Sequence, residues 1–322
     1  MAPIVTVIGS LNYDLVTFTN KVPQAGETYQ ANAFETHMGG KGLNEAVAVS
    51  RLSPPGQVHT RMVGRIGSDD FGRGLKQCLV DAGVDVSFVG TVEGSSGVAV
   101  ILVEKDGENR ILITSGSNGQ LKLSDAEYEE IFRGVESGFV VLQNEYPDTA
   151  RTISWLKSNR PRINIAYNPS PFKSELVTRE AWGKIDLLIV NEGEARDVAK
   201  LLLPELELSD DLAGFKSLAI EIQKLLNSEN VATVVITRGS KGSVFYNGKE
   251  GQPTFVASKK VDEVVDTTGA GDTFFGGVVS SLALAKSLEN AVNFATAASG
   301  LAIQKKGAAE GIPLYEDVVK NL

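Results

Sequence analysis

Short runs of β-branched and aliphatic residues alternate along this chain with segments whose apolar residues recur at helical spacing. The runs are typical of buried strands, and the segments between them are typical of amphipathic helices. This alternation predicts an α/β fold in which helices cover both faces of a mostly parallel central sheet, and such sheets bind ligands at the carboxyl ends of their strands. We expect strands at 4–9, 60–67, 96–104, 109–116, 138–143, 164–169, 186–191, 232–239 and 242–248, and helices at 44–52, 71–83, 148–159 and 217–228.

Two stretches in the first third of the chain interrupt the alternation. Residues from about 16 to 38 have no helical period, and residues 94–116 resemble a hairpin with KDGE (105–108) at its turn. We interpret both as a small β-sheet that projects from a single domain spanning residues 1–322 and forms a lid. The alternative is a surface excursion without a role in the site.

Composition narrows the range of partners. The 322 residues are 42% hydrophobic, which is enough for a sizeable core. The net charge of −9, without runs of lysine or arginine, argues against nucleic acid or an anionic membrane as a partner. Any anionic ligand must then be held by backbone N–H groups, a few cations or metal ions.

Cysteine and histidine are too sparse for a metal cluster. Cys78 is the only cysteine, and His37 and His59 lie far apart without neighbouring ligand patterns. Pro3 and a β-like run follow Met1 directly, so no signal peptide is expected, and the apolar segments are too short or too rich in glycine to span a bilayer. We expect an intracellular protein of the cytoplasm; a nuclear location is left open for a eukaryotic source.

The sequence DTTGAGDTFFGG (266–277) combines bare backbone with a carboxylate at a predicted helix start, after the β-rich segment 255–265. Glycine lets a ligand approach the main chain, and free N–H groups at a helix N-terminus bind anions such as a phosphoryl group. Asp272 then lies in the first helical turn. It is either a helix cap or a general base that takes a proton from an attacking hydroxyl.

A second glycine cluster, MGGKGLNEAVAVSRL (38–52), precedes an amphipathic helix. Lys41 and Asn44 would share one face of its first turn. An ordinary glycine-rich turn with a solvated lysine is the alternative. The spacing does not match the phosphate-binding P-loop.

Asn12 and Asp14 follow the first apolar run, and strand alternation would place them on one side. An amide that donates and accepts, beside a carboxylate that accepts, suits vicinal hydroxyls. Turn formation is the alternative for both residues. The segment also lacks the glycines of a dinucleotide-binding fingerprint.

Polar side chains end several other predicted strands. Each could be a polar strand end and nothing more, yet together they mark the edge where an α/β active site belongs. They are Glu145, Asn191, Glu194 and the strand–turn–strand segment Thr237, Arg238, Gly239, Ser240, Lys241 and Gly242.

In their order along the chain, these motifs resemble those of the ribokinase-like (PfkB-type) carbohydrate kinase superfamily. N-x-D, GGKGLN, the strand-end glutamate, NEGE, TRGSKG and DTTGAGDTFFGG all match, and the resemblance covers essentially the whole chain. It implies a three-layer α/β/α sandwich with a small β-sheet lid. It also implies ATP-dependent phosphorylation of D-ribose at O5 to give D-ribose 5-phosphate.

The resemblance also implies roles for individual residues. Asp272 would be the general base, and Gly269, Ala270 and Gly271 with the Asp272 N–H would form an anion hole for the γ-phosphoryl group. The residues implied for the sugar are Asn12, Tyr13, Asp14, Gly40, Lys41, Gly42, Leu43, Asn44, Glu145 and Asp272. Those implied for ATP are Asn191, Thr237, Arg238, Gly239, Ser240, Lys241, Gly242, Gly271, Asp272 and Thr296.

Two metal ions follow from the same resemblance. Glu194 would help to organise Mg²⁺, through water. A monovalent cation, K⁺, would be bound mainly by backbone oxygens. The residues implied for it are Asp266, Thr268, Ala302, Lys305, Gly307 and Gly311, the last standing where family members often carry a serine.

Several alternatives remain open. Fructokinase, adenosine kinase and phosphofructokinase-like activities belong to the same class, and a catalytically silent sugar or nucleotide sensor could use the same fold. A dinucleotide-dependent oxidoreductase is disfavoured by the broken fingerprint. The edge of the predicted lid could pair with a second subunit, so we expect a homodimer.

Overall fold

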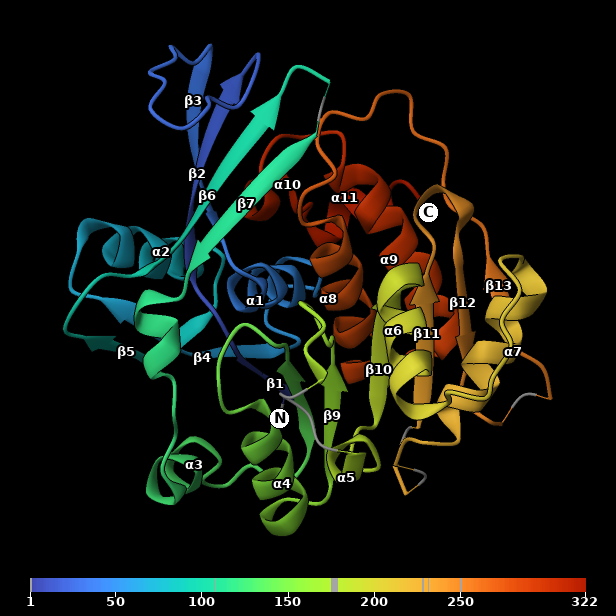
Figure 1. The fold of residues 1–322 in the computed structure, drawn as a ribbon. Helices are drawn as coiled ribbons and strands as arrows, with labels where there is room; N and C mark the ends of the chain where they lie inside the picture. Colours follow the sequence, from blue (N-terminus) through green and yellow to red (C-terminus); the bar gives the residue numbers. More distant parts are fainter. Residues whose placement is uncertain (1, 107, 175–178, 228, 231, 250) are drawn as a thin grey trace.

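The structure, a computed structural model, describes residues 2–106, 108–174, 179–227, 229–230, 232–249 and 251–322. Within these residues the strands form a nine-stranded sheet and a separate four-stranded sheet (Figure 1). In the large sheet the neighbours from β5 to β11 run parallel, and β12 and β13 are antiparallel. In spatial order its strands are β13 (Thr254–Val256), β12 (Ser243–Tyr246), β11 (Thr233–Thr237), β10 (Leu187–Asn191), β9 (Ile163–Tyr167), β8 (Gly138–Leu142), β1 (Ile4–Ile8), β4 (His59–Gly67) and β5 (Asp85–Val92).

Helices cover both faces of the large sheet, which confirms the predicted three-layer α/β/α sandwich. Alternate residues of the central strands enter two separate cores: Val141 of β8 packs with helices α1, α8 and α9, and its neighbour Leu142 packs with α3, α4, α6 and α7. The helices are α1 (Lys41–Arg51), α2 (Asp70–Asp81), α3 (Asp125–Ile131), α4 (Thr149–Asn159), α5 (Arg179–Trp182), α6 (Glu192–Leu202), α7 (Leu212–Gln223), α8 (Ala270–Ala283), α9 (Leu288–Ala302), α10 (Ala308–Gly311) and α11 (Tyr315–Val319).

The expected elements differ from the structure in a few places. Strand β5 was not expected, because as an edge strand it carries no continuous apolar run. The β-rich reading of 255–265 was wrong beyond Val256, since paired lysines (259–260) and acids (262–263) interrupt the apolar pattern there. Helix α1 begins at Lys41, three residues before the apolar helical segment 44–52, in agreement with the expectation that Lys41 and Asn44 lie in its first turn.

The four-stranded sheet consists of β2 (Asn12–Thr19), β3 (Ala33–Gly39), β6 (Gly97–Glu104) and β7 (Asn109–Thr114). It extends away from the large sheet, with β2 and β6 parallel at its centre (Figure 1). The expected hairpin is present as β6–β7, although Gly107 of its turn lies outside the described residues. The small sheet begins at Asn12 and not at about residue 16, because Asn12 and Asp14 already belong to strand β2.

Helices α1 and α8 pack closely on the same face of the large sheet. A Cβ added at Gly276 would overlap the Cβ of Ala48 and would lie 2.9 Å from the backbone nitrogen of Val49. Only glycine therefore allows this approach. Asp272 lies one turn before Gly276, and Asn44 lies one turn before Ala48, so the helix contact sets the distance between these two side chains.

Replacing Gly276 by alanine should therefore lower both stability and activity. Overpacking of a tight interior contact typically costs about 1–3 kcal/mol. We expect a lower thermal midpoint together with a loss of turnover, measured by calorimetry and by a kinase assay. Gly251→Ala, where an added Cβ meets nothing within 4 Å, is the matched control. Equal behaviour of the two variants would contradict the role of this helix contact.

Candidate active site

Strand β2 carries the two residues expected to hold vicinal hydroxyls. Asn12 and Asp14 are separated by one residue in the strand, as alternation requires, so neither forms a turn. Within the described residues, no protein donor lies within hydrogen-bond distance of the Asp14 carboxylate. Burial, together with the charges of Glu145, Glu310 and Asp272, raises the pKa of Asp14 to about 7. A carboxylate so placed is suited to accept hydrogen bonds from a ligand.

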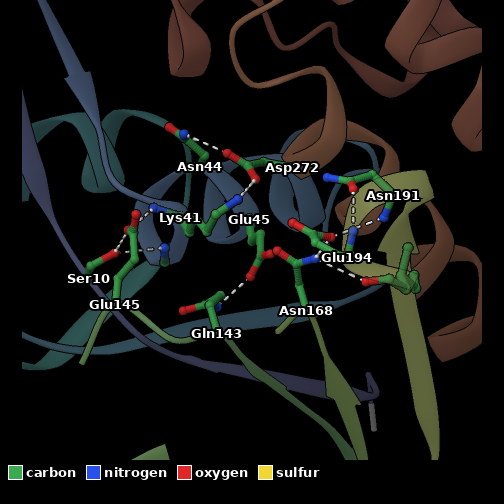
Figure 2. A network of polar contacts seen from close by, with 12 residues as sticks. Ser10, Lys41, Asn44, Glu45, Gln143, Glu145, Asn168, Asn191, Glu194 and Asp272 are labelled. Atoms are coloured by element: carbon green, nitrogen blue, oxygen red, sulfur yellow. Dashed lines mark hydrogen bonds and ion pairs between the residues drawn. The ribbon is translucent and has the colours of Figure 1, made fainter. Parts of the chain in front are cut away.

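The start of α1 brings Lys41 and Asn44 to Asp272 (Figure 2). Asn44 Nδ2 donates to Asp272 Oδ2 at 2.8 Å, and Lys41 Nζ lies 3.4 Å from Asp272 Oδ1. Lys41 is thus not a solvated turn residue. Burial alone would lower the pKa of Lys41, but Asp272 and Glu145 raise it above its ordinary value, so the ammonium group is retained.

Glu145 joins this cluster from the end of β8. Its Oε2 accepts the Lys41 backbone N–H at 2.9 Å and the Ser10 hydroxyl at 2.5 Å. Gly40 precedes the helix with a φ of 86°, and a Cβ there would lie 2.7 Å from the Asn12 backbone nitrogen. Glycine at this position therefore permits the loop to pass directly beside the strand that carries Asn12.

The start of α8 argues against the helix-cap interpretation of Asp272. The helix is capped by Gly269, whose φ of 74° is left-handed, and no side chain caps it. Asp272 instead turns its carboxylate toward Asn44 and Lys41, which leaves it available as a base. The Ala270 N–H already donates to Thr267 O at 3.2 Å. In the described part of the chain, the N–H groups of Gly269, Gly271 and Asp272 have no such acceptor and can face an anion.

A cavity of about 710 Å³ opens beside this helix start. It is large enough for a nucleotide, and six of the residues expected at the ATP site line it: Thr237, Gly239, Ser240, Gly242, Gly271 and Thr296. Ala270 of the expected anion hole lines it as well. Sequence reasoning missed Ser243, Ser258, Lys259, Lys260, Val261, Val264, Thr267, Phe274, Ser299, Gly300 and Ile303. The segment from Ser258 onward had been interpreted as β-structure, although its lysines and its lack of alternation already pointed to a loop.

Four other residues expected at the ATP site, Asn191, Arg238, Lys241 and Asp272, do not line the cavity. The Arg238 guanidinium donates to Glu192 at 2.8 Å and lies over the Phe215 ring, away from the cavity. Lys241 Nζ lies 3.5 Å from Glu192 Oε2. Asn191 forms a capping box with Glu194 at the start of α6.

Three of the residues expected to contact K⁺, Asp266, Thr268 and Gly307, also come together. Asp266 accepts the backbone N–H groups of Thr268 and Gly307 at 2.9 and 3.0 Å, which joins the two segments expected to hold K⁺. Burial raises the pKa of Asp266, but these hydrogen bonds outweigh it and the net shift is downward. No group of three or more His, Cys, Asp or Glu side chains that could hold a metal occurs within the described residues.

Helices long and apolar enough to cross a lipid bilayer are absent from the described part of the chain.

A family model described as pfkB family carbohydrate kinase matches residues 3–314. The chain belongs to this family. Its PfkB-type fold therefore extends over nearly the whole sequence.

Individual relatives agree with this PfkB assignment. The chain is 35% identical over 320 residues to the ribokinase of Schizosaccharomyces pombe, covering 98% of this chain and 96% of that protein. It is 36% identical over 322 residues to the ribokinase of Lactococcus lactis, covering 99% and 96%. The structure of Arabidopsis thaliana ribokinase complexed with ribose and ATP superposes with a TM-score of 0.85 at 31% identity, covering 99% of this chain and 98% of that one.

Asp14→Asn should stabilise the protein above pH 7. The folded-state pKa of about 7 lies above the ordinary value of 3.8, so the unfolded chain releases its proton first as the pH rises. The wild type loses stability through this window, and the variant does not. The difference in thermal midpoint should be largest above pH 7 and should vanish toward pH 3.8. A difference that is independent of pH would contradict the burial of an ionisable Asp14.

Proposed function

We propose that this PfkB-family chain transfers the γ-phosphoryl group of ATP to O5 of D-ribose, with Asp272 as the general base. The observation that carries the proposal is the position of Asp272. Its carboxylate contacts the Lys41 and Asn44 side chains, and its backbone N–H lies at the α8 start beside the 710 Å³ cavity. Asp272 thus contacts the candidate sugar site and directly follows Ala270 and Gly271, which line the candidate ATP site, an arrangement that suits in-line transfer.

The sugar is held between the small sheet and the start of α1. Asp14 accepts from hydroxyl groups, and Asn12 donates to them. Lys41, Asn44 and Glu145 complete the binding site from the main domain, together with the backbone of the remaining expected residues, Tyr13, Gly40, Gly42 and Leu43. The Arabidopsis relative, complexed with ribose and ATP, supports this choice of substrates.

The phosphoryl group is met by the unpaired N–H groups at the α8 start and by the helix dipole. Glu194 would hold Mg²⁺ through water, and the bound ion would neutralise charge on the ATP phosphates. Asp272 Oδ1 or Oδ2 accepts the proton of the attacking hydroxyl. Lys41 balances the negative charges of Asp272 and Glu145 before this proton is transferred. Because ATP is the donor, we place the activity in the cytoplasm.

Asp272→Asn tests the general base directly. The amide keeps the size of the side chain and an oxygen for the Asn44 contact, but it cannot accept the proton. We expect kcat to fall by about 10²–10⁴-fold, with sugar and ATP binding retained. Asp70→Asn, an exposed aspartate in the first turn of α2, is the matched control and should keep full turnover. Equal kcat values for Asp272→Asn and wild type would refute the assignment.

The K⁺ site is proposed from the loop geometry beside the anion hole. A Cβ at Gly311 would lie 3.1 Å from Ala302 O and 3.8 Å from Lys305 O, so these two carbonyl oxygens face the same point. Together with Asp266, Thr268 and Gly307, they suit a monovalent cation that prefers oxygen ligands. Gly311 supplies no side-chain oxygen there.

Gly311→Ser should therefore tighten K⁺ binding, because the hydroxyl would enter beside these carbonyl oxygens. Gly311 is not among the glycines with positive φ, so the backbone accepts a serine. We expect K⁺, but not Na⁺, to raise the thermal midpoint at lower concentration in the variant than in wild type. Gly251→Ser is the control for a serine in open space. An unchanged K⁺ titration would place the cation elsewhere.

We also propose a homodimer that forms through the small sheet. Three consecutive residues of its edge strand β7, Ile111, Leu112 and Ile113, are 50%, 70% and 53% exposed, so both faces of the strand are uncovered. An apolar surface of this kind on an open strand edge is typical of an interface.

Leu112→Asp should convert the dimer to a monomer, because the proposed interface would have to bury the carboxylate of the new side chain without a partner. Sedimentation at micromolar concentration measures the mass. Val80→Asp, an exposed valine of α2, is the control and should leave the dimer intact. A monomeric wild type would contradict the proposal.

A further inference from the structure

Asn118 lies where the small sheet returns to the main domain. It belongs to the 3₁₀ turn η1 (Gly116–Gln120), which directly follows β7, and it is 1% exposed. Its Oδ1 accepts the Leu11 N–H at 2.9 Å. Its Nδ2 donates to Leu11 O at 3.1 Å and to Asn12 Oδ1 at 2.8 Å. The pairing with both Leu11 backbone groups fixes which end of the amide faces Asn12.

This contact fixes the Asn12 carboxamide in turn. Because Asn12 Oδ1 accepts from Asn118, the Asn12 Nδ2 group is left as the outward donor. Within the described residues, no protein acceptor lies within hydrogen-bond distance of Asn12 Nδ2. Asn12 then offers a donor and Asp14 offers an acceptor, which is the pair that a hydroxyl group can satisfy in both directions.

The neighbouring strand is shaped around the same hydrogen bond. Gly97 of β6 pairs with Asn12 of β2, and a Cβ at Gly97 would overlap both Asn118 Nδ2 and Asn12 Oδ1. The bond between the two amides therefore passes directly over the Gly97 Cα. A side chain at this position would separate them without changing either amide.

The turn that carries Asn118 is anchored in the main domain. The Ser117 hydroxyl donates to Arg65 O at 2.9 Å, and the Ser117 N–H donates to Ser95 O at 2.9 Å. Ser117 is fully buried. Asn12 begins a strand of the small sheet. Through Asn118, its side chain is held in place relative to the large sheet.

We propose that Asn118 is a positioning residue for sugar binding: it holds the Asn12 carboxamide so that Nδ2 is presented to a sugar hydroxyl. The inference rests on the proposed sugar kinase function. Sequence reasoning passed over Asn118, because in GSNGQ it has the appearance of an ordinary turn residue.

The test compares Asn118→Ala, Asn12→Ala and the double variant in steady-state assays with D-ribose and ATP. Loss of a buried hydrogen-bonding partner should raise the KM for D-ribose by about tenfold in Asn118→Ala. The KM for ATP should stay near the wild-type value, and kcat should change far less than the KM for D-ribose. If Asn118 acts through Asn12, adding Asn118→Ala to Asn12→Ala should have little further effect on the KM for D-ribose.

Two further variants separate positioning from a general loss of structure. Gly97→Ala breaks the same contact from the other side and should reproduce the selective rise in the KM for D-ribose. Tyr128→Phe removes a buried hydrogen bond to Thr152 that lies outside this turn, and it should lower the thermal midpoint without changing the KM for D-ribose. Effects of Asn118→Ala and Asn12→Ala that multiply, or equal changes in the KM for both substrates, would overturn the proposal.

Failure of the proposed function has a different signature. If wild type does not turn over D-ribose but accepts another sugar, the substrate assignment is wrong, and the same five variants measured with that sugar still decide the role of Asn118. If Asn118→Ala unfolds, Asn118→Asp takes its place. It keeps the shape of the side chain but places an acceptor against Leu11 O and Asn12 Oδ1. It should show the same selective defect, and normal ribose binding by Asn118→Asp would also refute the proposal.

Discussion

The contact between helices α1 and α8 is the constraint on which the site depends. The two helices start at different points of the chain, after β3 and after the loop that follows β13, and each begins at a glycine with left-handed backbone. The overlap that any side chain at Gly276 would create with Ala48 shows how little room separates them. One turn before this contact, the Asn44–Asp272 hydrogen bond joins the candidate sugar site to the candidate anion site.

The charge of the site is unusual for a buried region. Lys41 interacts with the charges of Asp272, Glu145, Glu45 and Glu194, and Asp14 interacts with those of Glu145 and Asp272. Glu45 is fully buried on α1 and accepts from the Gln143 amide, and burial together with the charge of Asp272 raises its pKa well above the ordinary value (Figure 2). An excess of acceptors over donors suits a ligand with many hydroxyl groups, since each hydroxyl can donate a hydrogen bond to a carboxylate oxygen.

Much of this arrangement could be predicted from the sequence. The alternation of strands and helices gave the sandwich, because each central strand is buried on both faces and reads as an apolar run. The positions of Asn12, Asp14, Lys41, Asn44, Glu145 and Asp272 at strand ends and helix starts predicted that they would meet, and the structure brings Lys41, Asn44 and Asp272 into direct contact. The edge strand β5 was not predicted, since its half-exposed residues form neither an apolar run nor a clear alternation of apolar and polar positions.

The second layer of the site could not be predicted in this way. Asn118, Gly97 and Gly276 act through contacts with residues far away in sequence, and nothing in their local patterns distinguishes them from ordinary turn or helix glycines and asparagines. The orientation of Arg238 toward Glu192 likewise depends on the position of α6 rather than on the TRGSKG motif. Such roles follow from tertiary packing, which a local pattern does not encode.

The most direct test of the central claim is to identify the product formed from ATP and a panel of sugars. ADP release would be followed with D-ribose, 2-deoxyribose, fructose and adenosine in the presence of Mg²⁺ and K⁺, and the phosphorylated product would be identified by phosphorus NMR. The account predicts that ADP release requires a sugar, that D-ribose has the highest kcat/KM, and that the product is D-ribose 5-phosphate. ADP release without any sugar, or a clear preference for another acceptor, would contradict it.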